Sequence, residues 1–123
     1  MEILLGSTVG LIALDTLEAD GESVHAPELL DVEVLHVLRR VVAQRRMTER
    51  RAEQAMAILA DFPVQRHGHA ALLVRCWQHR ANLTAYDAMY VALAEGLQAT
   101  LLTCDAGIAS APGVQARVEV VRS

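Results

Sequence analysis

The chain has 123 residues, of which 53% are hydrophobic, and a net charge of -4 with eleven basic residues, none of them lysine. This length suits one domain, residues 1–123, with enough apolar side chains for a core. The negative charge excludes nucleic-acid binding by bulk charge. With one Trp, two Tyr and one Phe, the composition also excludes the aromatic surface of single-strand-binding domains.

The two thiols, Cys76 and Cys104, are isolated in the sequence, which favours a reducing compartment over a disulfide framework. Glu2 stands where a signal peptide would be basic, and no apolar run approaches the roughly 20 residues of a membrane helix. We therefore expect a cytoplasmic protein that does not enter a membrane.

The first half of the chain predicts helices with one short strand. Helical spacing of apolar residues from Glu2 to about Glu18 predicts two short helical pieces, and Ser23 to His25 predicts a very short strand. Pro27 is expected to open a long helix whose apolar face holds Leu30, Val34, Val37, Leu38 and Val41. Thr48 is expected to cap the next helix, which Pro63 stops.

The second half alternates helices with short strands. Pro63 to Gln65 predicts an extended piece, and His69 to His79 predicts a helix. From Leu83 to Asp105 the sequence predicts a helix capped by Thr84, a stop at Gly96, and a buried strand over Leu101 to Thr103. A short helix near Ala106 to Ser110 and an edge strand over Val118 to Val121 complete the chain.

This order predicts an α/β fold in which helices sandwich a small, mainly parallel sheet. Such domains normally begin with a buried central strand. The helical spacing after Glu2 instead predicts a chain that begins in a helix, with the first strand missing.

Two carboxylates are expected at one edge of this sheet. Asp87 lies in the first turn of the helix capped by Thr84, and Asp105 directly follows a strand. Taken singly, each acid is explained by helix capping or by the helix dipole. Together they suit a divalent metal, because open α/β sheets bind ligands beyond the carboxyl ends of their strands.

A third acid is expected from the helix after Pro27. On a helical wheel both Asp31 and Glu33 border the apolar face, where a carboxylate is partly desolvated and needs a partner. Asp31 also lies in the first turn, where it stabilises the helix dipole. Periodicity leaves the choice between the two acids open.

Six arginines crowd around the junction of two predicted helices: Arg39, Arg40, Arg45, Arg46, Arg50 and Arg51. They either keep the surface soluble and complement a helix C-terminus, or they contact phosphates. His67 and His69 flank a glycine in a predicted turn with no third ligand nearby, which does not favour a zinc site.

Three segments in this order resemble the PIN-domain ribonuclease toxins of the VapC type: HAPELLDVEVLHVLRR at His25 to Arg40, LTAYDAMYVALAEGL at Leu83 to Leu97, and LLTCD at Leu101 to Asp105. The resemblance implies a PIN-like three-layer α/β/α sandwich. It selects Glu33 over Asp31, and takes Glu33, Asp87 and Asp105 as catalytic and metal-binding acids. It makes Thr103 the hydroxyl residue before the last acid.

Members of this family begin with a strand that ends in a fourth acid. The resemblance matches the first ten residues here to the helix after that strand, so the chain is expected to start about ten residues late and to lack this acid.

The resemblance further implies cleavage of tRNA or ribosomal RNA with Mg²⁺ or Mn²⁺, a homodimer, and a VapB-type antitoxin. Arg39 and Arg40, with Thr103, are the expected substrate contacts. The alternative is a catalytically impaired PIN remnant that binds antitoxin or dimerises, because three acids hold a metal less well than four.

Overall fold

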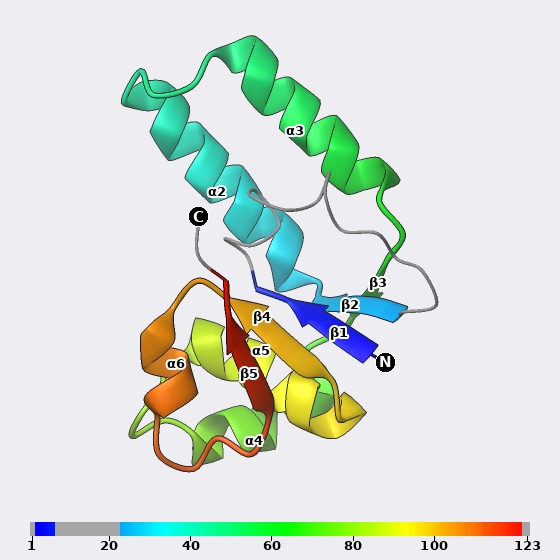
Figure 1. The fold of residues 1–123 in the computed structure, drawn as a ribbon, viewed down its shortest axis with the longest axis vertical. Helices are drawn as coiled ribbons and strands as arrows, with labels where there is room; N and C mark the ends of the chain where they lie inside the picture. The colour runs from blue at the N-terminus through cyan, green and yellow to red at the C-terminus, as the bar shows by residue number, and fades with distance from the viewer. Residues whose placement is uncertain (1, 7–22, 122–123) are drawn as a thin grey trace.

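The structure, a computed structural model, describes residues 2–6 and 23–121. Within these residues, five strands form one sheet: β1 (Glu2–Leu5), β2 (Ser23–Pro27), β3 (Val64–His67), β4 (Thr100–Thr103) and β5 (Arg117–Val120). The strands lie in the order β3-β2-β1-β4-β5, and every neighbouring pair is parallel (Figure 1). The predicted parallel sheet, with its last strand at an edge, is confirmed.

Helices cover both faces of the sheet, as Figure 1 shows. The hairpin of α2 (Leu29–Ala43) and α3 (Glu49–Asp61) packs on one side. On the other side lies α5 (Ala85–Leu97), joined by α4 (Leu73–Gln78), which follows a 3₁₀ turn at Ala70–Leu72, and by α6 (Ala106–Ser110). This arrangement confirms the three-layer α/β/α sandwich. In the described part of the chain, no helix is long and apolar enough to span a membrane.

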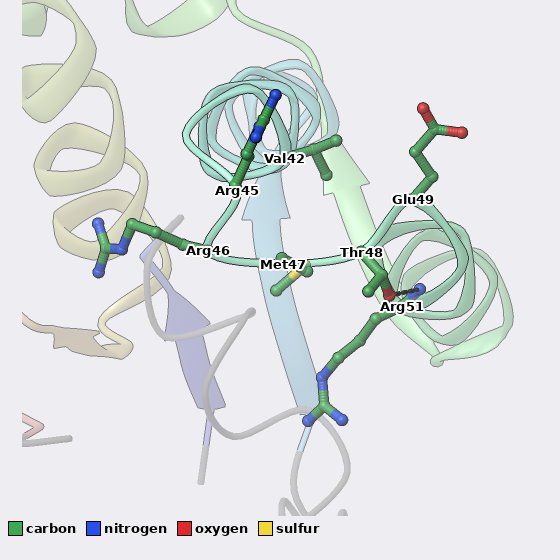
Figure 2. Close-up of a pocket in the computed structure, with 7 residues that line it drawn as sticks. All are labelled: Val42, Arg45, Arg46, Met47, Thr48, Glu49 and Arg51. Carbon is green, nitrogen blue, oxygen red and sulfur yellow. Dashed lines mark hydrogen bonds between the residues drawn. The ribbon is translucent and has the colours of Figure 1, made fainter.

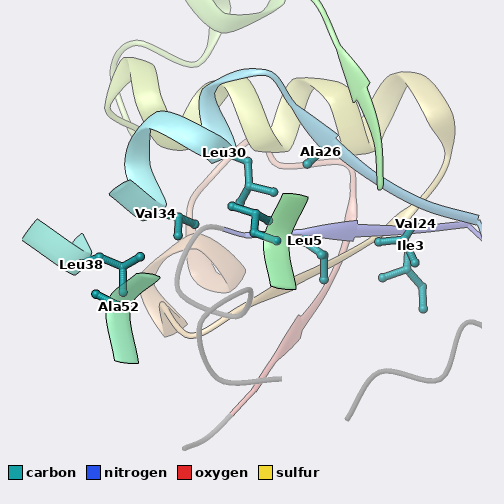
Figure 3. Close-up of a cluster of buried hydrophobic side chains, with 9 residues drawn as sticks. Ile3, Leu5, Val24, Ala26, Leu30, Val34, Leu38 and Ala52 are labelled. Atoms are coloured by element: carbon teal, nitrogen blue, oxygen red, sulfur yellow. The ribbon is translucent and has the colours of Figure 1, made fainter. Parts of the chain in front are cut away.

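The alternation of side chains along β1 separates two apolar cores. Ile3 and Leu5 belong to one buried cluster with Leu30, Val34 and other residues of the α2 and α3 side (Figure 3). Leu4, between them in sequence, points the other way and packs with Leu101 and residues of α5. Successive residues of a strand face opposite sides of a sheet, so one four-residue strand contributes to both cores.

The prediction that the first strand is missing is wrong, because Glu2–Leu5 forms β1 in the centre of the sheet. Ile3, Leu4 and Leu5 are all buried, as both faces of a central parallel strand are. A short apolar run of this kind cannot be distinguished from a buried helix by periodicity. The rest of the predicted helix, up to Glu18, lies outside the described residues.

Two predicted helix boundaries are also wrong. Pro27 does not open a helix; it ends β2, and α2 begins at Leu29. Gly96 lies inside α5, which ends at Leu97 and is capped by Gln98 in the left-handed conformation (φ 53°). The N–H of Ala99 donates to the carbonyl of Ala94 (2.9 Å), so the six-residue closing bond of a Schellman motif forms without glycine.

Candidate functional site

The ends of β1, β4 and α5 meet in a small pocket of about 110 Å³. The pocket contains both carboxylates predicted for this edge of the sheet, Asp87 from the first turn of α5 and Asp105 from the turn after β4. Its lining comprises Gly6, Asp87, Tyr90, Leu101, Thr103, Asp105 and Ile108. The predicted meeting of the two acids is therefore observed.

Local hydrogen bonds fix Asp105. The Asp105 Oδ1 accepts a hydrogen bond from the Gly107 N–H (2.8 Å), which caps α6. The buried Thr103 Oγ1 accepts one from the Asp105 N–H (3.1 Å) and holds the turn after β4. Thr103 thus orients the acid through the backbone, and the cap of α6 orients it through Oδ1.

Asp87 is held by the cap of α5. Its backbone N–H donates to the Thr84 Oγ1 (3.1 Å), as the Thr-x-x-acid pattern predicts. Burial raises the pKa of the Asp87 carboxyl above its usual range, a hydrogen bond with Thr84 lowers it in part, and the charge of Asp105 raises it again. A buried carboxylate whose pKa is raised by a second carboxylate beside it favours a cation or a proton.

The first strand brings no acid to this pocket within the described residues. β1 ends at Leu5, and the following Gly6 lines the pocket and donates its N–H to the Leu102 carbonyl (2.8 Å). A Cβ at position 6 would lie 2.9 Å from that carbonyl oxygen. Glycine therefore allows the close approach of β1 to β4 at this edge.

The structure distinguishes the two acids that periodicity left open. Asp31 is already paired with Arg66, whose Nε and Nη2 donate to its two carboxylate oxygens (2.7 and 2.9 Å). Glu33 has a buried Oε1 with no hydrogen-bond partner among the described residues. Glu33 is therefore the acid that is available for a ligand.

Glu33 does not line the pocket of Asp87 and Asp105. It lines a separate pocket of about 450 Å³ with Leu29, Val32, His36, Val37 and Tyr86. Tyr86 directly precedes Asp87, so the first turn of α5 contributes one residue to each pocket. Across residues 2–6 and 23–121, no three His, Cys, Asp or Glu side chains are grouped closely enough to hold a metal ion.

The arginines lie elsewhere. Arg39 and Arg40 are exposed in the last turns of α2, and neither lines the acidic pocket. Arg45, Arg46 and Arg51 surround a shallow pocket of about 530 Å³ at the junction of α2 and α3. Figure 2 shows their guanidinium groups pointing away from one another, so they do not converge on one anion.

The histidines make structural hydrogen bonds that sequence reasoning missed. The Nδ1 of the buried His25 lies 2.8 Å from the Nε2 of His67, and burial lowers the pKa of His25. The His69 Nε2 accepts from the Leu29 N–H (3.1 Å), which satisfies a donor at the start of α2. His25 and His67 are separated by 42 residues, and the pairing of β2 with β3 brings them to diagonal positions on neighbouring strands.

The PIN-domain family model matches residues 2–114 of the chain. The chain belongs to the PIN-domain family. Ribonuclease VapC1 of Mycobacterium tuberculosis is 40% identical over 123 residues, covering 99% of this chain and 92% of the relative. Ribonuclease VapC12 of the same species is 34% identical over 121 residues, covering 98% and 92%. This is a PIN domain of the VapC type.

Solved structures agree on the fold. VapBC2 from Rickettsia felis, bound to a DNA fragment of its promoter, superposes with a TM-score of 0.70 at 14% identity and covers 98% of each chain. FitAB bound to a DNA fragment gives a TM-score of 0.59 at 17% identity, covering 96% of this chain and 94% of the other. For a PIN domain of the VapC type, the roles assigned to Glu33, Asp87 and Asp105 stay predictions.

Proposed function

We propose that this PIN domain is a Mg²⁺-dependent endoribonuclease toxin that hydrolyses RNA phosphodiester bonds. One observation carries the proposal: Asp87 and Asp105 share a pocket at the carboxyl edge of a parallel sheet. Relatives with 34 and 40% identity bear the name Ribonuclease VapC, which favours RNA as the substrate class.

The residues of the site fit a hard divalent cation. Mg²⁺ takes oxygen ligands, keeps several waters and is often bound by only one or two carboxylates. Asp87 and Asp105 would hold it, and Mn²⁺ would fit the same donors. The raised pKa of Asp87 is a feature that a cation in this pocket would relieve.

When bound, such a metal polarises the phosphate and neutralises charge that develops during in-line displacement. The protein's own groups do the rest. Thr103 keeps Asp105 oriented through its backbone N–H, and the Thr84 cap keeps Asp87 at the pocket.

We further propose a VapB-type antitoxin as partner, a homodimer as the assembly, and tRNA or ribosomal RNA as the substrate. Structures named VapBC2 and FitAB, which share this fold, support the antitoxin. Sequence-specific RNA recognition usually acts on single-stranded loops whose bases are unstacked, so that one phosphate can reach a small acidic pocket. Thr103, Arg39 and Arg40 remain the proposed substrate contacts, although both arginines lie outside the pocket.

The test is cleavage of a structured RNA by the 123-residue protein with and without Mg²⁺ or Mn²⁺. We expect cleavage that EDTA abolishes, and a loss of at least about 100-fold in Asp87→Asn and Asp105→Asn, the order of magnitude of a lost catalytic group. Asp61→Asn, which changes an exposed acid at the end of α3, is the matched control. Equal rates in Asp87→Asn and the control would contradict the proposal.

A second function is favoured by Gly6, which leaves the end of β1 without a carboxylate. On this alternative the chain is a catalytically impaired PIN domain that binds antitoxin or dimerises. It predicts antitoxin binding by the folded protein without metal-dependent cleavage, so cleavage that EDTA inhibits would exclude it.

A further inference from the structure

The pocket lined by Glu33 and Tyr86 is separate from the pocket that contains Asp87 and Asp105. It lies between α2 and the first turn of α5, and its volume of about 450 Å³ is within the range of small-molecule sites. Most of its lining is apolar and includes one aromatic ring. Its polar groups are Glu33, His36 and the Tyr86 hydroxyl.

Tyr86 is exposed although it is one of only four aromatic residues in the chain. Its exposed fraction is 60%, whereas Tyr90, one turn further along α5, is 4% exposed in the core. Val32, on the facing helix, is 64% exposed. A ring and an aliphatic side chain are thus presented to solvent on opposite sides of one hollow, which the packing of α5 does not require.

We propose that this pocket binds a nucleobase of the RNA next to the scissile phosphate, with the Tyr86 ring stacked on the base. The inference rests on the proposed function and adds a substrate-positioning residue to it. Every base has a π face that stacks on aromatic side chains, so one exposed ring is sufficient for contact and no aromatic surface is needed.

The charge of the pocket favours a base over a phosphate. The Glu33 carboxylate is in the wall and would repel a phosphate, whereas it would accept hydrogen bonds from the amino or imino groups of a base. Because Tyr86 and Asp87 are adjacent, their Cα atoms lie about 3.8 Å apart. A base held by Tyr86 therefore keeps the attached phosphate near the acidic pocket.

The experiment measures binding separately from cleavage. A short single-stranded RNA with 2-aminopurine at one position is titrated with protein in EDTA, and fluorescence quenching reports stacking. We expect Tyr86→Leu to lose the quenching and to weaken binding about 5- to 150-fold, the fold change that corresponds to a base-stacking energy of about 1–3 kcal/mol. Tyr86→Phe keeps the ring and should retain both.

Trp77→Leu is the matched control, because it removes an equally exposed aromatic ring (67%) that does not line this pocket. Circular dichroism checks that each variant is folded, and Tyr86→Gln replaces Tyr86→Leu if the latter does not fold. Wild-type affinity and quenching in the ring-free variant would overturn the inference, as would the absence of RNA binding by the wild type. If Tyr86→Leu leaves RNA binding unchanged but weakens antitoxin binding, the inference is overturned and the pocket binds a side chain of the antitoxin instead.

Parallel cleavage assays with Mg²⁺ separate the two proposals. If the wild type does not cleave but its RNA binding depends on the Tyr86 ring, the proposed function fails and the inference stands. If the wild type cleaves and Tyr86→Leu raises neither KM nor the dissociation constant, the inference fails and the proposed function stands.

Discussion

At the scale of single residues, Glu33 connects stability with function. Its Oε1 is buried and has no hydrogen-bond partner among the described residues, and a charged group in this state destabilises the folded protein. Proteins retain such a buried polar atom where a ligand supplies the missing hydrogen-bond partner. The proposed function makes that ligand a divalent cation or its waters, and the base-binding proposal makes it the amino or imino group of a base. Only the first predicts a response of Glu33 to Mg²⁺ without RNA.

We therefore expect Glu33→Gln to leave the metal-free protein at least as stable as the wild type, while reducing its response to Mg²⁺. A ligand that binds only the folded state stabilises by about 2.7 kcal/mol at 100 times its dissociation constant. Thermal unfolding with and without Mg²⁺ measures this response. Glu53→Gln changes an exposed acid of α3 and should respond as the wild type does. An unchanged response in Glu33→Gln would remove Glu33 from the site.

At the scale of elements, Gly6 determines how closely β1 approaches β4. The contact that a Cβ would make at 2.9 Å is with the backbone oxygen of Leu102, which cannot move without shifting a central strand. We expect Gly6→Ala to reduce the free energy of unfolding by about 1–3 kcal/mol, as other overpacking substitutions do. Denaturant unfolding measures the change.

Gly68→Ala is the control for this substitution, since a Cβ there meets no atom within 4 Å. It should change stability by less than about 1 kcal/mol, because it alters chiefly the entropy of the unfolded chain. A cost for Gly6→Ala no larger than that for Gly68→Ala would show that β1 can shift away from β4.

Elements whose signals are local could be predicted from the sequence. Thr84 and Thr48 accept hydrogen bonds from residues three positions on, and Asp105 caps α6 within its own turn. These caps identified α5, α3 and α6. β1 could not be identified, because its burial depends on β2 and β4, whose pairing residues begin at Ser23 and Thr100.

The site residues also divide into those with local signals, which could be predicted, and those that depend on long-range contacts, which could not. Asp87 and Asp105 were predicted to meet because each lies at the end of a locally defined element. Asp31 could not be separated from Glu33, because its partner Arg66 lies 35 residues away and reaches it only after β3 pairs with β2. Tyr86 carried no signal apart from its place in the first turn of α5.

At the scale of the whole molecule, Glu95 ties together segments that are far apart in sequence. Its carboxylate accepts hydrogen bonds from the Arg75 guanidinium (two at 2.8 Å), the His79 Nε2 (3.1 Å) and the Gln115 N–H (2.9 Å). Burial alone would raise the pKa of Glu95, but the hydrogen bonds from Arg75, Gln115 and His79, together with the charge of Arg75, lower it from 4.5 to about 2.

The folded-state pKa of Glu95 is depressed, so its stabilisation is fully present above pH 4.5 and is lost as pH falls towards about 2. We expect Glu95→Gln to reduce the free energy of unfolding at pH 7 by about 1–3 kcal/mol, because it leaves a partly buried guanidinium without its charge partner. The difference from the wild type should shrink between pH 4.5 and about 2.

The ion pair of Asp31 and Arg66 provides the comparison. It has the same two-pronged geometry, but its side chains are 43% and 28% exposed, whereas Glu95 is 10% exposed. Asp31→Asn should therefore cost only about 0–1 kcal/mol, as exposed pairs do. Denaturant unfolding of both variants at several pH values measures the contrast. Equal costs, or a cost for Glu95→Gln that does not change with pH, would mean that geometry, and not burial of the charge, determines what these pairs contribute.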